Sequence, residues 1–368
     1  GTFGAVYGPV LALGTGMFVV YGLGSLPMGW IAGRVGRPVL LLAFFLGTGV
    51  AMVAAGFATG PWTLAAALFC MGAFSAIYHP IGTAMLVDAA GTRVGAAVGV
   101  NGVFGNLGVA LAPVVTAAVA AWLGWRWGFI LPGLLCVAGG VLYALNGLTD
   151  VAQAKAASRP FPEIPRAVVR RAVLVLLCTA TTSGFVFNGF TLLLPKLMEE
   201  RMAGSPDLLP LVGGLAFLVT LCGGLTQFTV GRLIDRTTLK RVFMPLALVQ
   251  MPALLLLTLL DGGAVLLVSA LVCASVFGQV TVTETMTARY VAPALRAKLY
   301  SIRFSVGFLG AALASPVVAG LHDAYGGSGA VLAVLGGFAT VTLAAALFFP
   351  DREEELKPEL WSRAVPAG

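Results

Sequence analysis

Residues 39–57 read VLLLAFFLGTGVAMVAAGF, an uncharged run that begins just after Arg37 and ends just before Gly60 and Pro61. At 1.5 Å per residue, a helix of this length crosses about 30 Å, the thickness of the hydrocarbon core of a bilayer. Lipid offers no hydrogen-bond partner to an open backbone, so the run predicts a membrane-spanning helix. Eleven apolar segments of this kind occur along the chain, at residues 10–31, 39–57, 63–87, 94–122, 127–148, 173–194, 208–234, 242–260, 264–288, 299–321 and 329–349.

The composition excludes a water-soluble protein. Of the 368 residues, 59% are hydrophobic and only 10% are charged, whereas soluble domains carry about 25% charged residues. The five cysteines stand singly, without a C-x-x-C spacing, and the sequence contains no G-x-x-x-x-G-K-[ST] phosphate loop. We therefore expect no metal site, no cofactor and no ATP-driven chemistry. A membrane enzyme would need clustered catalytic groups, and the chain has two histidines.

The basic residues indicate the orientation in the membrane. If the loop with Arg34 and Arg37 is cytoplasmic, all of the 22 lysines and arginines except Arg126, Lys196 and Arg201 fall on that side. This is the positive-inside bias of membrane proteins. The formal net charge of +7 is therefore expected at the inner face of the membrane and not at a nucleic-acid site.

A polar stretch at residues 150–171, rich in proline and arginine, predicts a cytoplasmic linker between two halves. The N-terminal half is expected at residues 1–149, the C-terminal half at residues 172–350 and a cytoplasmic tail at residues 351–368.

Two pairs of segments repeat at a spacing of 202 residues, which predicts duplicated halves. Residues 29–34 (GWIAGR) align with residues 231–236 (GRLIDR), and residues 105–112 (GNLGVALA) align with residues 307–314 (GFLGAALA). The same spacing maps the helix at residues 173–194 to positions before residue 1. We therefore expect an all-α six-plus-six bundle, with helices 2 to 12 in this chain and helix 1 missing from it.

The first repeated segment resembles the loop between helices 2 and 3 of the major facilitator superfamily, roughly G-x-x-x-D-R-x-G-R-R. The glycines and arginines are kept, but the usual aspartate is Gly33, whereas the second copy keeps its acid. The resemblance implies a cytoplasmic gate, in which the second copy acts alone if the acid is essential. The gate residues are Gly29, Arg34, Gly36, Arg37, Gly231, Asp235 and Arg236.

Within that superfamily, residues 75–80 (SAIYHP) and residues 102–113 resemble fosmidomycin-resistance-type efflux proteins, although Ile81 stands where those proteins tend to have an acid. Small residues in helices 5 and 11 let helices approach closely. The predicted packing residues are Gly105, Gly108, Pro113, Gly307, Gly310 and Pro316.

By the same resemblance, helices 1, 4, 7 and 10 line a central cavity, where polar groups are costly unless they are used. The expected substrate contacts are Ser75, Tyr78, His79, Asn188, Gln279 and Thr283. His79 has two interpretations. Imidazole exchanges a proton near neutral pH, so His79 is either a coupling or substrate group or a neutral, hydrogen-bonded side chain that steadies the kink at Pro80. Pro80 also frees the carbonyl of Ala76 as a ligand or hinge.

Glu284 is the one acid that the pattern places well inside a span, and Arg303 is expected at a similar depth in the next helix. Glu284 is therefore either a proton carrier or half of a structural or gating ion pair with Arg303.

These observations predict a secondary transporter that exports a small organic solute in exchange for protons by alternating access. Uptake symport and uncoupled facilitation are the nearest alternatives, followed by a receptor or scaffold that transports nothing. The expected partners are a small-molecule substrate, protons and membrane lipid, without nucleic acid. The protein is expected to be a monomer in a bacterial inner membrane.

Overall fold

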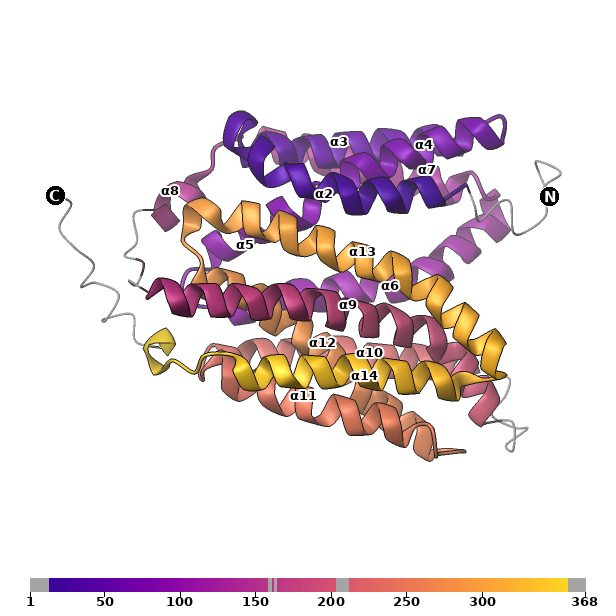
Figure 1. The fold of residues 1–368 in the computed structure, drawn as a ribbon. Helices are drawn as coiled ribbons and strands as arrows, with labels where there is room; N and C mark the ends of the chain where they lie inside the picture. Colours follow the sequence, from indigo (N-terminus) through magenta and orange to yellow (C-terminus); the bar gives the residue numbers. More distant parts are fainter. Residues whose placement is uncertain (1–12, 158–160, 162–163, 203–211, 357–368) are drawn as a thin grey trace. The chain divides into compact units, whose positions relative to one another are not determined.

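The computed structural model describes residues 13–157, 161, 164–202 and 212–356, and the elements in these residues are helical (Figure 1). Among these residues, eleven spans are long and apolar enough to cross a membrane, which confirms the all-α membrane fold. The helices are α2 (Thr15–Val35), α3 (Arg37–Gly56), α4 (Pro61–Ser75), α5 (Tyr78–Ala90), α6 (Val94–Leu123), α7 (Trp127–Leu145), α8 (Val151–Ala157), α9 (Arg166–Arg201), α10 (Val212–Ile234), α11 (Leu239–Leu256), α12 (Ala264–Tyr290), α13 (Pro293–Tyr325), α14 (Ser328–Phe348) and the short 3-10 helix η2 (Glu353–Leu356).

The chain forms two compact units, and two helices contribute to both of them. Unit 1 contains α2 to α5, the second part of α6, α7, α8 and the first part of α13, Pro293–Phe308. Unit 2 contains the first part of α6, helices α9 to α12, the second part of α13 and α14. The units therefore differ from the halves expected from the linker by an exchange of helix segments. The predicted division into halves stays a prediction.

In unit 1, α4 packs against α2 and α3, and α3 packs against α7 (Figure 1). Glycines permit the closest of these contacts. A Cβ atom at Gly49 would lie 2.7 Å from the carbonyl oxygen of Gly133, so α3 and α7 meet at their backbones. Gly36 separates α2 from α3 with φ +91°, a value that a residue with a side chain rarely adopts.

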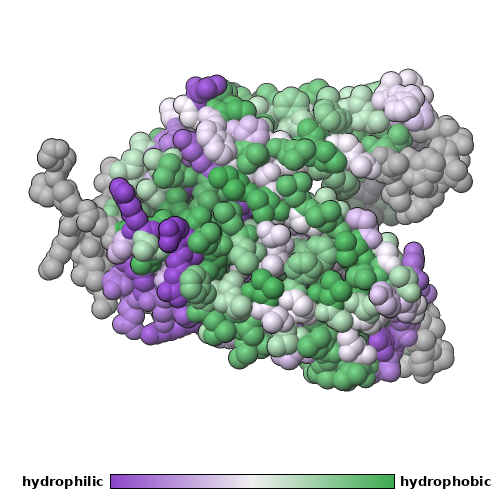
Figure 2. Space-filling model, in the orientation of Figure 1, coloured by the Kyte–Doolittle hydropathy of each residue, from purple (hydrophilic) through white to green (hydrophobic). Residues whose placement is uncertain are grey.

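In unit 2, α9 packs against α12 and α14, and α11 packs against the same two helices. Apolar side chains such as Phe190, Leu254 and Leu335 fill the space between them and are at most 1% exposed. Figure 2 shows apolar side chains along the middle of α9 and α14 and hydrophilic ones beside their ends. This distribution suits helices whose middle faces lipid.

The predicted helix at residues 63–87 is broken into α4 and α5 by a turn at Ala76 and Ile77. Pro80 explains the break, because proline has no N–H group and its ring clashes with the carbonyl four residues earlier, that of Ala76. The fully buried Ser25 of α2 supplies the missing partner. Its Oγ lies 3.1 Å from the Ala76 carbonyl oxygen and 2.9 Å from that of Tyr21. The carbonyl expected as a ligand or hinge is thus bound within unit 1.

We expect the substitution Ser25→Ala to lower the stability of the protein by about 1–2 kcal/mol, because it leaves a buried carbonyl without a partner. In a Pro80→Ala background the loss should shrink, since the new N–H group of residue 80 can bond to the Ala76 carbonyl. Thermal unfolding of the purified protein in detergent measures both effects.

Thr181→Ala is the control, because Thr181 is exposed and its hydroxyl bonds back to the Leu177 carbonyl of its own helix. An equal loss from Ser25→Ala in both backgrounds would contradict this explanation of the helix break.

Candidate functional site

His79 lies in the first turn of α5, surrounded by aromatic rings from three helices of unit 1. The ring centroids of Phe304, Tyr78, Phe308 and Tyr21 lie 4.8, 5.5, 5.6 and 6.2 Å from that of the imidazole. We call these five residues the His79 cluster. His79 itself is partly exposed.

The structural interpretation of His79 predicts a hydrogen-bonded imidazole. In the part of the chain that the structure describes, no side chain or backbone group accepts from or donates to its nitrogen atoms. The surrounding rings hold the imidazole by packing alone, and its two nitrogens remain available to a solute or a proton.

Arg303 is the cationic neighbour of this cluster. It lies on the first part of α13, is 7% exposed, and its guanidinium carbon lies 4.5 Å from the ring centroid of Phe304. It therefore acts electrostatically on the imidazole. Glu284 is also 7% exposed but belongs to unit 2, so the predicted pairing of Glu284 with Arg303 stays a prediction.

The other two expected contacts in this region, Ser75 at the end of α4 and Tyr78 at the start of α5, each pack against α3. The hydroxyl of Ser75 lies 3.4 Å from that of Thr48 on α3. The ring of Tyr78 packs against Phe44 with a centroid distance of 5.1 Å. Both residues are partly exposed, so they remain able to contact a solute.

In unit 2, the expected contact Gln279 is fully buried and bonded at both ends of its amide. Ser183 donates to its Oε1 at 2.8 Å, and its Nε2 donates to Gln250 at 2.9 Å. Asn188 and Thr283 bond back to carbonyls of their own helices. Gln279 therefore ties α9, α11 and α12 together, and the roles of these three residues in substrate binding stay predictions.

The first gate motif is organised around an acid outside the motif itself. Asp88, at the end of α5 and 2% exposed, accepts from Arg37 at 2.6 Å and from Arg296 of α13 at 2.5 Å. Arg37 also holds Asp150 through two bonds of 2.6 and 3.0 Å. Arg34 is exposed. Buried charges need such multiple partners, so this network fixes the start of α13 against α5 and α3.

The second gate motif uses its own acid in a different way. The carboxylate of Asp235 accepts the backbone N–H groups of Gly95 and Ala96, each at 2.8 Å. These groups belong to the first turn of α6, whose N–H groups have no partner within the helix and attract negative charge. Asp235 is thus a helix cap. Arg236 is exposed.

The two motifs occupy equivalent places in their units. Gly231 of α10 touches Gly95 of α6 at the backbone, and Gly29 of α2 touches Ala297 and Lys298 of α13. Residue 95 plus the repeat spacing is residue 297, so the duplication read from the sequence also relates these two helix contacts.

The expected packing glycines divide into two groups. A Cβ atom at Gly310 would meet the Thr181 carbonyl oxygen at 3.2 Å, whereas one at Gly105 or Gly108 would meet nothing within 4 Å among the described residues. Earlier glycines of α6 make its closest contacts with α10. Of the other predicted packing residues, Pro113 lies within α6, and Gly307 and Pro316 lie within α13. The packing role of Gly105 and Gly108 therefore stays a prediction.

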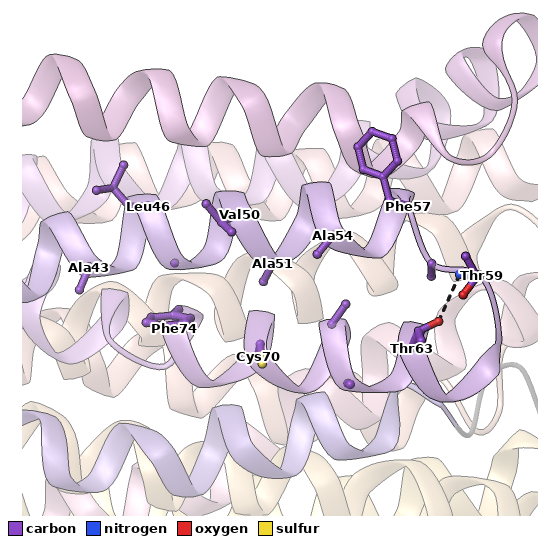
Figure 3. Close-up of a pocket in the computed structure, with 14 residues that line it drawn as sticks. Ala43, Leu46, Val50, Ala51, Ala54, Phe57, Thr59, Thr63, Cys70 and Phe74 are labelled. Carbon is purple, nitrogen blue, oxygen red and sulfur yellow. Dashed lines mark hydrogen bonds between the residues drawn. The ribbon is translucent and has the colours of Figure 1, made fainter.

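A recess lies between α3 and α4 and has a volume of about 790 Å³ (Figure 3). Its lining is apolar apart from Thr59, Thr63 and Cys70. The Thr63 hydroxyl caps the start of α4 by accepting the N–H groups of Thr59 and Gly60 at 3.2 and 3.0 Å. We call this recess the α3–α4 groove. It offers few groups to a polar solute.

The profile of the Major Facilitator Superfamily matches residues 2–283 and 204–366. The chain belongs to this superfamily. The family places it among membrane transporters rather than enzymes, and the eleven candidate spans in the described residues make it a multi-pass membrane protein.

Several solved superfamily structures share the fold. The human organic anion transporter MFSD10 is similar with a TM-score of 0.72 and 20% identity, over 92% of this chain and 83% of that one. A variant of the fucose:proton symporter FucP of E. coli is similar with a TM-score of 0.71 and 15% identity, over 94% and 92%. The proton:xylose symporter XylE is similar with a TM-score of 0.68 and 15% identity, over 96% and 89%.

A curated relative is the uncharacterized MFS-type transporter YfnC of Bacillus subtilis (strain 168). It is 34% identical over 97 residues, which cover 26% of this chain and 24% of YfnC. The resemblance to fosmidomycin-resistance-type proteins is not confirmed by these comparisons.

The sequence interpretation missed three charged residues of the network around the first gate motif, namely Asp88, Asp150 and Arg296. Asp88 and Asp150 are the only acids in the stretches of sequence that make up unit 1, and this scarcity was the available signal. Their shared dependence on Arg37 follows from the fold alone.

We predict that Asp88→Asn destabilises the protein by about 3 kcal/mol, because it leaves two buried arginines without their common carboxylate. Adding Gly33→Asp should restore part of the loss, since the repeat places Gly33 where Asp235 stands and a Cβ atom at Gly33 meets nothing within 4 Å among the described residues. Thermal unfolding in detergent measures both variants. Asp323→Asn, at a side chain that is 86% exposed, is the control.

If Asp88→Asn unfolds like the control, the network does not hold α13. If the double variant is no more stable than Asp88→Asn, Asp88 does not stand in for the acid missing at Gly33.

Proposed function

We propose that this chain is a secondary active transporter that moves a small organic solute by alternating access, with proton-coupled export as its mode. The observation that carries the proposal is the His79 cluster. It places a titratable imidazole, without a hydrogen bond to the described residues, at a helix break inside a membrane span.

The charges around His79 suit a role in coupling. The titratable and charged groups that face it are Tyr21 on α2, Tyr78 on α5 and Arg303 on α13. A proton on the imidazole adds a second positive charge beside Arg303, and like charges repel at this range. Protonation would therefore weaken the packing of the first part of α13 against α2 and α5.

That packing is held by the Asp88 network at the start of α13 and by two hydroxyl bonds. The Gly29 N–H group donates to Ser301 Oγ at 2.8 Å, and Ser305 Oγ donates to the Gly22 carbonyl at 3.0 Å. Opening requires these bonds to break, and a charge at His79 acts on the same helix. Glu284, buried in α12, is the proposed second group of the proton pathway or the gating partner of Arg303.

The printed names of the solved neighbours describe an organic anion transporter and two proton symporters of sugars. They support a small organic substrate and are compatible with proton coupling in either direction. Export rests on the resemblance of residues 75–80 and 102–113 to efflux proteins. Uptake symport is the second candidate. We further propose that the protein acts as a monomer in a bacterial inner membrane.

The test begins with a thermal-shift screen of the purified protein against metabolites and antimicrobials. A stabilising compound is then added to proteoliposomes that enclose a pH-sensitive dye. We expect proton movement opposite to the compound in the wild-type protein, and at least a tenfold loss of this movement in His79→Phe, which keeps a ring but removes the titratable group.

His322→Gln, at the second histidine of the chain, is the control and should keep coupling. Proton movement in the same direction as the compound would establish symport in place of export. Transport of the compound without proton movement, or full coupling in His79→Phe, would refute the role of His79.

A further inference from the structure

We infer that the transported solute carries a planar unsaturated ring with a hydrogen-bonding group on its edge, and that the His79 cluster binds this ring. The inference rests on the proposed function and names the substrate class for that site.

The first support is the density of rings. Four aromatic rings from α2, α5 and α13 lie with centroids within 6.2 Å of the imidazole, and Tyr21 lies 4.5 Å from Phe308 across the cluster. The ring pairs are tilted or edge-to-face, apart from Phe304 and Phe308, which are stacked with centroids 6.0 Å apart. Aromatic rings favour such arrangements over a face-to-face sandwich because of their charge distribution. A flat unsaturated ring can add to such a set at either its face or its edge.

The second support is the imidazole itself. A polar group among apolar rings loses free energy unless it finds a hydrogen-bond partner. Among the residues that the structure describes, the nitrogens of His79 have none, and the residue is partly exposed. A solute that only filled apolar space would leave these nitrogens unsatisfied, whereas one with a hydroxyl, amide or ring nitrogen would satisfy one of them.

The third support is the contrast with the α3–α4 groove, which also lies in unit 1. The groove is larger than a single ring needs, and the aromatic side chains in its lining are Phe57 and Phe74 alone. The groove can accommodate apolar groups of many shapes and does not select for a flat ring. The His79 cluster supplies both ring surfaces and a directional polar atom, which is how small-molecule sites obtain specificity.

The test uses three probes of similar size: benzamide, cyclohexanecarboxamide and ethylbenzene. Binding to the purified full chain in detergent is measured by equilibrium dialysis. We expect benzamide to bind at least fivefold more tightly than cyclohexanecarboxamide, which lacks the flat ring, and than ethylbenzene, which lacks the polar edge.

Two variants separate the two contributions. His79→Phe keeps a ring and should abolish the advantage of benzamide over ethylbenzene while leaving its advantage over cyclohexanecarboxamide. Phe308→Leu should reduce the advantage over cyclohexanecarboxamide. Phe57→Leu, in the α3–α4 groove, is the matched control and should change neither.

Equal binding of the three probes by the wild-type protein would overturn the inference, as would loss of binding in Phe57→Leu but not in Phe308→Leu. Flux of benzamide into proteoliposomes tests the proposed function separately. Selective binding without flux would refute transport and leave the ring site standing, whereas flux of all three probes at one rate would refute only the ring site.

Discussion

A side chain at Gly29 would collide with the backbone of Ala297 and Lys298, and one at Gly231 would collide with the carbonyl of Gly95. These two contacts bring α13 against α2 and α6 against α10 at backbone distance. A helix pair that touches in this way has little freedom to slide, because a shift of one residue brings a side chain into the contact. The register so fixed places Ser301 opposite the Gly29 N–H group and Asp235 opposite the start of α6. The polar contacts around both gate motifs therefore depend on the absence of a side chain at Gly29 and at Gly231.

The duplicated architecture holds these two contacts by different electrostatic means. In unit 2 a carboxylate caps the first turn of α6, an interaction between a charge and the dipoles of free N–H groups. In unit 1 the equivalent position is Gly33, and Asp88 binds α13 through the side chain of Arg296. The cap needs only backbone atoms, whereas the ion pair depends on two specific side chains and on Arg37, which also holds Asp150 at the start of α8. The start of the predicted linker is thus connected to the first gate motif through Asp150.

Much of this fold could be predicted from the sequence, because its main determinants are local. The hydrophobic segments and the basic loops follow from the physics of the bilayer, which acts on each span separately. The repeat at Gly29 and Gly231 was visible as well, because two short stretches of sequence match at a fixed spacing. The break at Ala76 could be predicted only in part. Pro80 indicated a disturbed turn, but the hydroxyl of Ser25 that bonds to the Ala76 carbonyl comes from another helix. The Asp88 network joins residues 208 positions apart, and no local pattern reports such a contact.

The candidate site shows the same division between local and long-range information. His79 and Tyr78 were evident as polar residues in an apolar span, since such residues are rare unless they are used. Their surroundings were not evident, because Phe304 and Phe308 belong to a helix that the sequence assigns to the other half. α13 is divided between the two units, and both of its parts make contacts described above. Its first part packs beside the imidazole and begins at the Asp88 network, and its second part continues into unit 2 with Gly310 against Thr181. In the proposed mechanism, a change of charge at His79 would therefore act on a single helix that contributes to both units. The aromatic packing around the imidazole would determine how strongly that change reaches α13.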